Sequence, residues 1–169
     1  MRRIILLSVA ALLVVALAVP AIAAPSNKGT TYVTPSDVTL SVLQGVTAPA
    51  SLDEVDEVLV AGFGITGKPA AKGFNDGVIK HVGGLEIASQ LGVIEIRNFW
   101  IDTVAGTVSA EVADLGRFDL FNLADVATDV GDCEVTATLE FNEFASDAIV
   151  GTDISIEGLP AGTACVDLG

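Results

Sequence analysis

The sequence contains a single histidine, His81, and this residue is the first place where chemistry could occur. It lies near the end of a predicted strand, Gly77–Val82, and the following Gly83-Gly84 pair indicates a tight turn into the next strand. A histidine in this position could be presented to a ligand, either as an axial ligand or as a polar anchor. The same pattern is also typical of a lone, half-exposed histidine beside a turn, with no ligand at all.

Other catalytic or metal-binding patterns do not occur in the sequence. One histidine excludes a metal site built from several histidines, and neither a Gly-x-Ser-x-Gly elbow nor a Walker loop is present. The acidic stretches Asp53–Glu57 and Asp129–Asp132 could offer oxygen ligands to calcium, but neither matches the EF-hand loop. Pairs of carboxylates are too common in so acidic a chain to indicate a glycosidase. We therefore predict no catalytic activity and no metal site.

The N-terminal residues predict export from the cytoplasm. Met1–Arg3 is a short basic start, Ile4–Val19 is almost entirely apolar, and Ala21–Ala23 has the small-x-small pattern that signal peptidase reads. A transmembrane anchor is the alternative, but the apolar run is short for a bilayer, which needs about 20 residues. We predict a signal peptide over residues 1–24, cleaved near Ala23-Ala24, and a secreted protein with no stable membrane span.

Cys133 and Cys165 are the only cysteines, and both lie in the exported part. An even pair of cysteines in an oxidising compartment predicts a disulfide, which here would tie the last long strand to the C-terminal one. A free catalytic thiol is the alternative, but no partner base lies nearby in the sequence. We therefore predict a Cys133–Cys165 disulfide.

The exported part is strongly acidic and has the size of one domain. Removing Arg2 and Arg3 with the signal peptide leaves six basic residues against 22 acidic ones, a net charge of about −16. Such a surface repels phosphate backbones, so we predict no nucleic-acid partner. About 145 residues are enough for one domain with a proper core. We place a flexible tether at residues 25–31 and a single domain at residues 32–169.

Alternating apolar and polar residues predict antiparallel strands. The alternation is cleanest at Thr107–Ala113 and at Cys133–Phe141, where it places Cys133 and every second residue after it inward. In Val93–Asp102 the pattern places Ile94, Ile96 and Trp100 on one face. Further strands are predicted at Val58–Ile65, Gly77–Val82, Leu85–Ala88, Phe118–Leu123 and Gly162–Leu168.

Two short helices complete the predicted elements. One runs from Pro35 to Gln44, capped by Thr34 and stopped by Gly45, and the other is Glu143–Val150. Many short strands with few helices indicate an all-β fold. We predict an antiparallel β-sandwich, either Ig-like or an open-barrel variant, with two short helices.

Two segments carry a resemblance to known proteins: His81–Leu85 and Ile96–Asp102, within a match from about Val58 to Leu168. They resemble a group of secreted actinobacterial proteins that is distantly similar to the HtaA-type haem-binding domain of Gram-positive cell-surface haem-uptake proteins. The resemblance implies an all-β domain with two short helices. In haem-binding members it also implies an N-terminal tyrosine that ligates iron and a histidine, in an H-x-G-x-L motif, that hydrogen-bonds to that tyrosine.

The chain matches only part of this arrangement. His81, Gly83 and Leu85 fit the histidine motif. By contrast, the segment Asp37–Gly45, which holds most of the first predicted helix and the glycine that stops it, carries no tyrosine, and Tyr32 lies ahead of it. No cofactor is therefore predicted, with haem as the possibility that the resemblance raises.

Two functions stay open at this point. In the first, the protein is a non-catalytic interaction or structural module of the cell envelope or extracellular space, with an unknown partner. In the second, it binds a small haem-like ligand, with His81 as ligand or anchor and Tyr32, Phe99 and Trp100 as an apolar wall. We favour the first, because a haem-binding member would retain its iron ligand, and we expect haem binding to be weak or absent.

Overall fold

The computed structural model describes residues 29–67, 77–90 and 92–168. The predicted signal peptide and residues 25–28 of the predicted tether lie outside these ranges. The described residues form eleven strands and two short helices. In chain order these are β1 (Thr30–Pro35), α1 (Asp37–Val42), β2 (Leu43–Thr47), β3 (Ser51–Val55), β4 (Val58–Gly67), β5 (Val78–His81), β6 (Gly84–Ser89), β7 (Gly92–Asp102), β8 (Thr107–Val112), β9 (Gly116–Val130), β10 (Cys133–Phe141), α2 (Glu143–Val150) and β11 (Pro160–Asp167).

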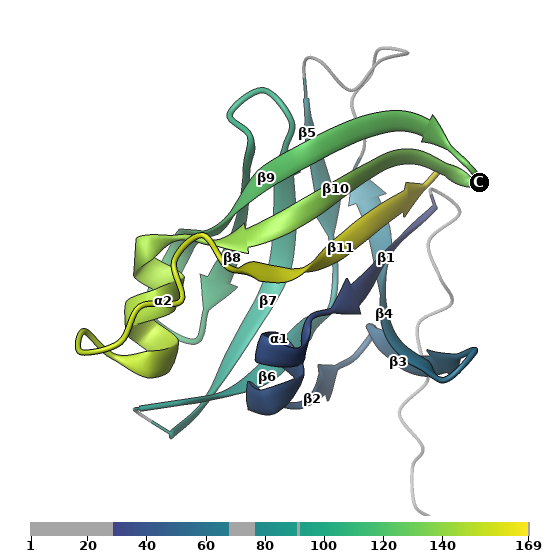
Figure 1. Cartoon of the computed structure of the whole chain (residues 1–169). Helices are drawn as coiled ribbons and strands as arrows, with labels where there is room; N and C mark the ends of the chain where they lie inside the picture. Colours follow the sequence, from purple (N-terminus) through teal and green to yellow (C-terminus); the bar gives the residue numbers. More distant parts are fainter. Residues whose placement is uncertain (1–28, 68–76, 91, 169) are drawn as a thin grey trace, which may run out of the picture.

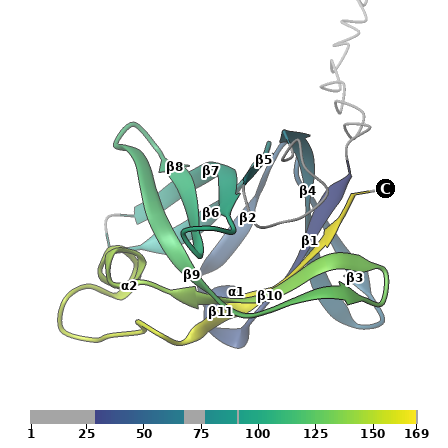
Figure 2. The same cartoon turned by 90° about the horizontal axis from the view of Figure 1, so that it is seen from above.

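Eight of these strands close into an antiparallel barrel (Figures 1 and 2). Around the ring, each strand pairs with the next in the order β1, β4, β5, β7, β8, β9, β10 and β11, and β11 pairs with β1. The predicted all-β antiparallel fold with two short helices is confirmed. The sheet closes on itself instead of packing as the two separate sheets of an Ig-like sandwich.

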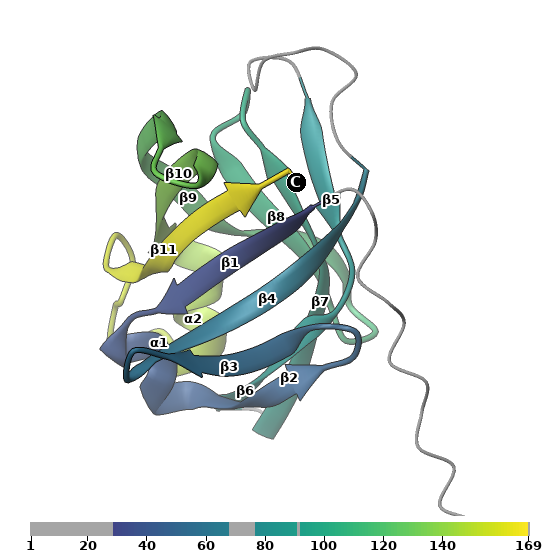
Figure 3. The ribbon, with the colours of Figure 1, turned by 90° about the vertical axis from the view of Figure 1, so that its right-hand side faces the viewer.

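The remaining strands and the helices extend this barrel on one side. β6 pairs with the first half of β7, and β2 pairs with β6. β3 pairs with β4 on the side opposite to β1, so that β4 lies between β1 and β3 (Figure 3). α1 contacts β1, β11 and β6, and α2 contacts β9 and β6, so both helices lie at the end of the barrel next to β6 (Figure 1).

The alternation in β8 and β10 points the predicted residues into the barrel. All six side chains on which the prediction depends are at most 7 % exposed: Val108, Ala110, Val112, Val135, Ala137 and Leu139. Glu134 and Glu140, at the intervening positions, are half-buried. Helix α2 has the predicted bounds, and the side chain of Asn142 caps it by accepting a hydrogen bond from the N–H of Ala145. The two-residue alternation and the helix signals were therefore sufficient to predict the inward faces of β8 and β10 and the bounds of α2.

Strand β1 begins inside the predicted flexible tether, so that prediction is wrong for Thr30 and Thr31. Both residues pair with β4 on one side and with β11 on the other. Thr31 is 2 % exposed and points into the barrel. Strands β2 and β3 were not predicted either. Among the described strands, β2 pairs only with β6, and β3 pairs only with β4. Both sequences are five residues long and carry little apolar alternation, and that of β3 is also acidic.

Helix α1 is shorter than the predicted range Pro35–Gln44. Its N-cap is Ser36, whose hydroxyl accepts a hydrogen bond from the N–H of Thr39 at 3.3 Å, and not Thr34. Thr34 belongs to β1, where its backbone pairs with β11. The helix ends at Val42 because the next residues form β2 against β6.

Trp100 lies on the outer face of the barrel, which contradicts the prediction that it shares a face with Ile94 and Ile96. The register of β7 against β8 shifts just before it, where Asn98 has a positive φ of 54°. Such a β-bulge adds one residue to the strand and reverses the side-chain alternation beyond it. Phe99 is consequently buried, and Trp100 faces outward.

The predicted disulfide joins Cys133 in β10 to Cys165 in β11, with their Cα atoms 5.3 Å apart. Cys165 lies between the buried residues Ala164 and Val166, so its side chain is on the outer face of β11. The prediction that Cys133 faces inward is therefore wrong. The strand register places Thr136 opposite Cys165, so the end of the β9–β10 hairpin bends toward the outside of β11 to bring Cys133 to its partner.

We expect the substitution Gly83→Ala to lower the free energy of unfolding by about 3 kcal/mol. Gly83 has a φ of +89°, and a Cβ atom there would lie 2.6 Å from the backbone nitrogen of Ala50. The left-handed backbone contributes about 1–2 kcal/mol, and the steric overlap adds about 1–3 kcal/mol. Gly106 is a matched control, because its φ is +70° and nothing lies within 4 Å. Equal losses for Gly83→Ala and Gly106→Ala in denaturant unfolding would contradict a steric role.

Candidate functional site

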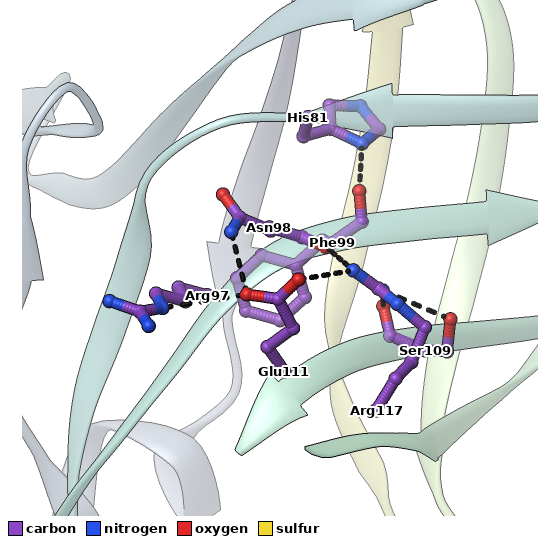
Figure 4. Close-up of polar contacts among 7 residues, drawn as sticks. All are labelled: His81, Arg97, Asn98, Phe99, Ser109, Glu111 and Arg117. Carbon is purple, nitrogen blue, oxygen red and sulfur yellow. Dashed lines mark hydrogen bonds and ion pairs between the residues drawn. The ribbon is translucent and has the colours of Figure 1, made fainter. Parts of the chain in front are cut away.

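His81 lies inside the barrel, at the end of β5, and is 3 % exposed. Its Nδ1 is 3.0 Å from the carbonyl oxygen of Phe99 in β7 (Figure 4). Its Nε2 is 2.7 Å from the hydroxyl oxygen of Thr31 in β1. A carbonyl oxygen only accepts, so Nδ1–H donates to Phe99, and Nε2 accepts from the Thr31 hydroxyl. Both nitrogens of the ring are therefore used in bonds that join β5 to β7 and to β1.

The environment keeps His81 neutral. Burial lowers its pKa from 6.5 to about 4, and the hydrogen bond to the Phe99 carbonyl opposes this shift only in part. At neutral pH the ring therefore carries no charge. The half-exposed histidine beside a turn, which was one of the two sequence-based interpretations, is not what the structure shows.

A cavity of about 60 Å³ lies next to His81 in the barrel interior. Aromatic side chains from four strands form part of its wall: Phe63, Phe99, Phe121 and Phe141. Thr39 of α1 also borders it, but its hydroxyl donates to the carbonyl of Ala161 at 2.6 Å. Since the polar side chains of the wall bond to other protein groups, the surface that faces the cavity is apolar.

The four residues proposed from the sequence as a ligand wall do not all meet. His81 and Phe99 both border the cavity. Tyr32 is 43 % exposed on the outside of β1, opposite Cys165. Trp100 also faces outward, and its ring contacts two cations, Lys80 and Arg117. The structure thus divides the set into an inner pair and two outer residues on different strands.

Trp100 and the polar side chains around it form a network on the outer face of the barrel, which we call the outer-face network. Its members are Lys80, Arg97, Asn98, Trp100, Glu111 and Arg117. Figure 4 shows Arg97, Asn98, Glu111 and Arg117. The Nζ atom of Lys80 is 4.2 Å from the Trp100 ring centroid, and Cζ of Arg117 is 3.9 Å from it. Both distances are typical of cation–π contacts.

Glu111 is the centre of this network. Its carboxylate accepts a hydrogen bond from the Asn98 amide at 2.8 Å and pairs with Arg97 at 3.5 Å and Arg117 at 3.4 Å. The Asn98 hydrogen bond, followed by the charges of the two arginines, lowers the pKa of Glu111. Arg117 also donates to the carbonyl of Asn98 at 2.9 Å, which holds the bulge of β7 against β9.

The sequence-based search missed Thr31 and Glu111. Thr31 was assigned to the tether, although Thr31 and Val33 alternate with Tyr32 as a strand would. Glu111 lies within the predicted strand Thr107–Ala113, but the strand pattern indicates no partner for its side chain. Its partners come from β7 and β9, and the bulge at Asn98 that brings them together has no clear sequence signal.

The residues present do not fit the haem arrangement that the resemblance implies. That arrangement requires a tyrosine that meets the histidine on the inside, whereas Tyr32 lies on the outer face and Thr31 takes the place beside His81. Moreover, Nε2 of His81 already accepts a hydrogen bond, and iron would have to displace it.

Comparisons with known proteins add no assignment: no protein-family model, curated protein or solved structure matches the chain. Within the described ranges, no group of three or more His, Cys, Asp or Glu residues is placed to hold a metal ion. None of the helices in that part of the chain is long and apolar enough to cross a membrane.

Proposed function

We propose that this protein is exported and acts as a non-catalytic interaction module of the cell envelope or extracellular space. The observation that carries the proposal is the position of His81 and Gly83, from the first of the two segments that resemble known proteins. The side chain of His81 joins β5 to β1 and β7, and Gly83 allows a close approach to Ala50. These residues stabilise the barrel, so we place the contact with a macromolecular partner on its outer surface.

The outer-face network is the part of that surface best suited to a partner. It contains Lys80, Arg97 and Arg117, which are all the basic residues in the described part of a chain with a net charge of −14. Among the described residues, an acidic surface with all its lysines and arginines on one face is electrostatically polarised. Trp100 and the arginines are also the residue types that carry most binding energy at protein interfaces.

The test uses the mature protein and isolated actinobacterial cell envelopes, with co-sedimentation as the readout. We expect wild-type protein to sediment with the envelopes and Lys80→Gln to weaken this binding about tenfold. Thr163→Glu, at an exposed position of β11, changes the net charge by the same amount away from the network and is the matched control. No sedimentation of the wild type, or equal losses in both variants, would contradict the proposal.

The alternative of a haem-binding domain is tested separately. Haem titration followed at the Soret band is expected to show weak binding or none, because His81 offers no free nitrogen and Tyr32 lies outside. A tight complex whose Soret band is lost on Tyr32→Ala or His81→Ala would replace the interaction-module proposal with a small-ligand function.

A further inference from the structure

The least buried part of the wall of the cavity beside His81 lies around α1. Most of its wall is formed by fully buried barrel residues such as Phe63 and Phe141. By contrast, five bordering residues are only half-buried: Val33 and Pro35 of β1, which leads into α1, Val42 of α1, Leu43 of β2 and Leu85 of β6. The route into the cavity with the least protein to displace therefore passes between α1 and β6.

Water is a poor occupant of this space. A buried water molecule needs two to four polar partners, and a cavity without them stays dry. Here the hydroxyl of Thr31 is bonded to His81, and that of Thr39 is bonded to Ala161. Among the described residues, no buried side-chain nitrogen or oxygen lacks a hydrogen-bond partner. The space is therefore suited to an apolar guest.

The size of the cavity limits the guest further. Its volume is about 60 Å³, compared with about 150 Å³ for a protein cavity that binds benzene. An aromatic ring, and still more a flat macrocycle, is too wide. The end of an unbranched aliphatic chain is narrower and can extend from the cavity through the α1 side.

Acidic residues near the α1 side disfavour a negatively charged head group on the bound chain. Asp37 in the first turn of α1 and the exposed Glu86 of β6 both lie on the elements that border the entrance. No lysine or arginine occurs on α1, β2 or β6. A carboxylate head would thus be repelled, while an uncharged head would not.

We propose that the barrel interior is a binding site for the end of an uncharged aliphatic chain, which enters between α1 and β6. This inference goes beyond the proposed function and does not depend on it, because it uses the interior and not the outer-face network.

The test is a titration of the mature protein with 1-decanol and with decanoate, followed by the methyl NMR signals of Val42, Leu43 and Leu85. We expect 1-decanol to shift these signals in a saturable way and to bind at least tenfold more tightly than decanoate. A second titration uses phosphatidylcholine vesicles. If only the vesicles shift the signals, the bound chain belongs to a membrane lipid; if 1-decanol shifts them, the bound chain belongs to a free compound. No shift in either arm, or equal binding of decanol and decanoate, would overturn the proposal.

Two alanine variants locate the site. Ala61 borders the cavity and is 1 % exposed, whereas Ala137 is 7 % exposed and does not border it. Ala61→Val fills part of the cavity and is expected to weaken decanol binding at least tenfold, while Ala137→Val changes it less than twofold. Circular dichroism establishes that both variants are folded. Wild-type affinity in a folded Ala61→Val variant would place the chain elsewhere. Envelope binding should be unchanged in both, which separates this test from that of the proposed function.

Discussion

Replacing both cysteines, Cys133→Ala with Cys165→Ala, is expected to lower the free energy of unfolding by about 4 kcal/mol. The disulfide closes a loop with a sequence separation of 32 residues. In the chain-entropy description, a loop of that length restricts the unfolded chain by about 3.7 kcal/mol at 25 °C. For a domain of this size the melting temperature should fall by about 10 °C. Denaturant and thermal unfolding of the oxidised wild type and the double variant measure the difference.

Reduction of the wild-type protein provides the control for this prediction. If loop closure is the cause, the reduced wild type and the double variant should have the same stability, because neither has the link. A loss below about 1 kcal/mol in both would show that the β9–β10 hairpin end is constrained equally well without the link. Two free thiols in the native, unreduced protein would contradict the disulfide itself.

The sequence predicted those parts of the fold in which local pattern and tertiary environment agree. Strand β10 has one face in the core and the other toward the outside, so its alternation gave the correct bounds, Cys133–Phe141. Asn142 follows it directly as an N-cap, so the start of α2 was also predictable. The disulfide needed only the count of cysteines and the predicted export.

Closure of the barrel could not be predicted in the same way. It depends on the pairing of β1 with both β4 and β11, and β11 lies more than a hundred residues away in the sequence. β1 itself is six residues long, and four of the six are threonine or tyrosine, a composition that fits a polar tether as well as a strand. Whether this segment is a tether or a strand depends on its pairing with β4 and β11, which places Thr31 inside the barrel.

The sequence identified one residue of the candidate site, His81, but not the arrangement of the residues around it. His81 was identified because it is the sole histidine, but its burial follows from the pairing of β5 with β4 and β7. The bulge at Asn98 then exchanged the roles of Phe99 and Trp100, so that Phe99 borders the cavity and Trp100 does not. A single inserted residue thus decided which aromatic side chain lies beside the histidine.

Because His81 is buried in its neutral form, acid is expected to destabilise the fold through this one residue. Its pKa is about 4 in the folded protein and 6.5 when the chain is unfolded. Between these values the unfolded chain binds a proton that the folded chain does not, so stability increases with pH. The contribution is fully present above pH 6.5 and is lost as the pH falls toward 4, by about 3 kcal/mol in total.

The pH dependence of unfolding isolates this contribution, since the chain contains no other histidine. Between pH 6.5 and 5, before most carboxylates titrate, the wild type should lose about 1.5 kcal/mol. His81→Gln removes the titrating ring and should flatten the curve in that interval. Thr31→Val keeps the ring but removes the hydrogen bond to its Nε2, so we expect a loss of about 1–3 kcal/mol at pH 7 with the slope retained. A slope that persists unchanged in His81→Gln would show that another group causes the acid sensitivity. The pKa of the His81 imidazole would then have to be close to 6.5 in the folded protein as well.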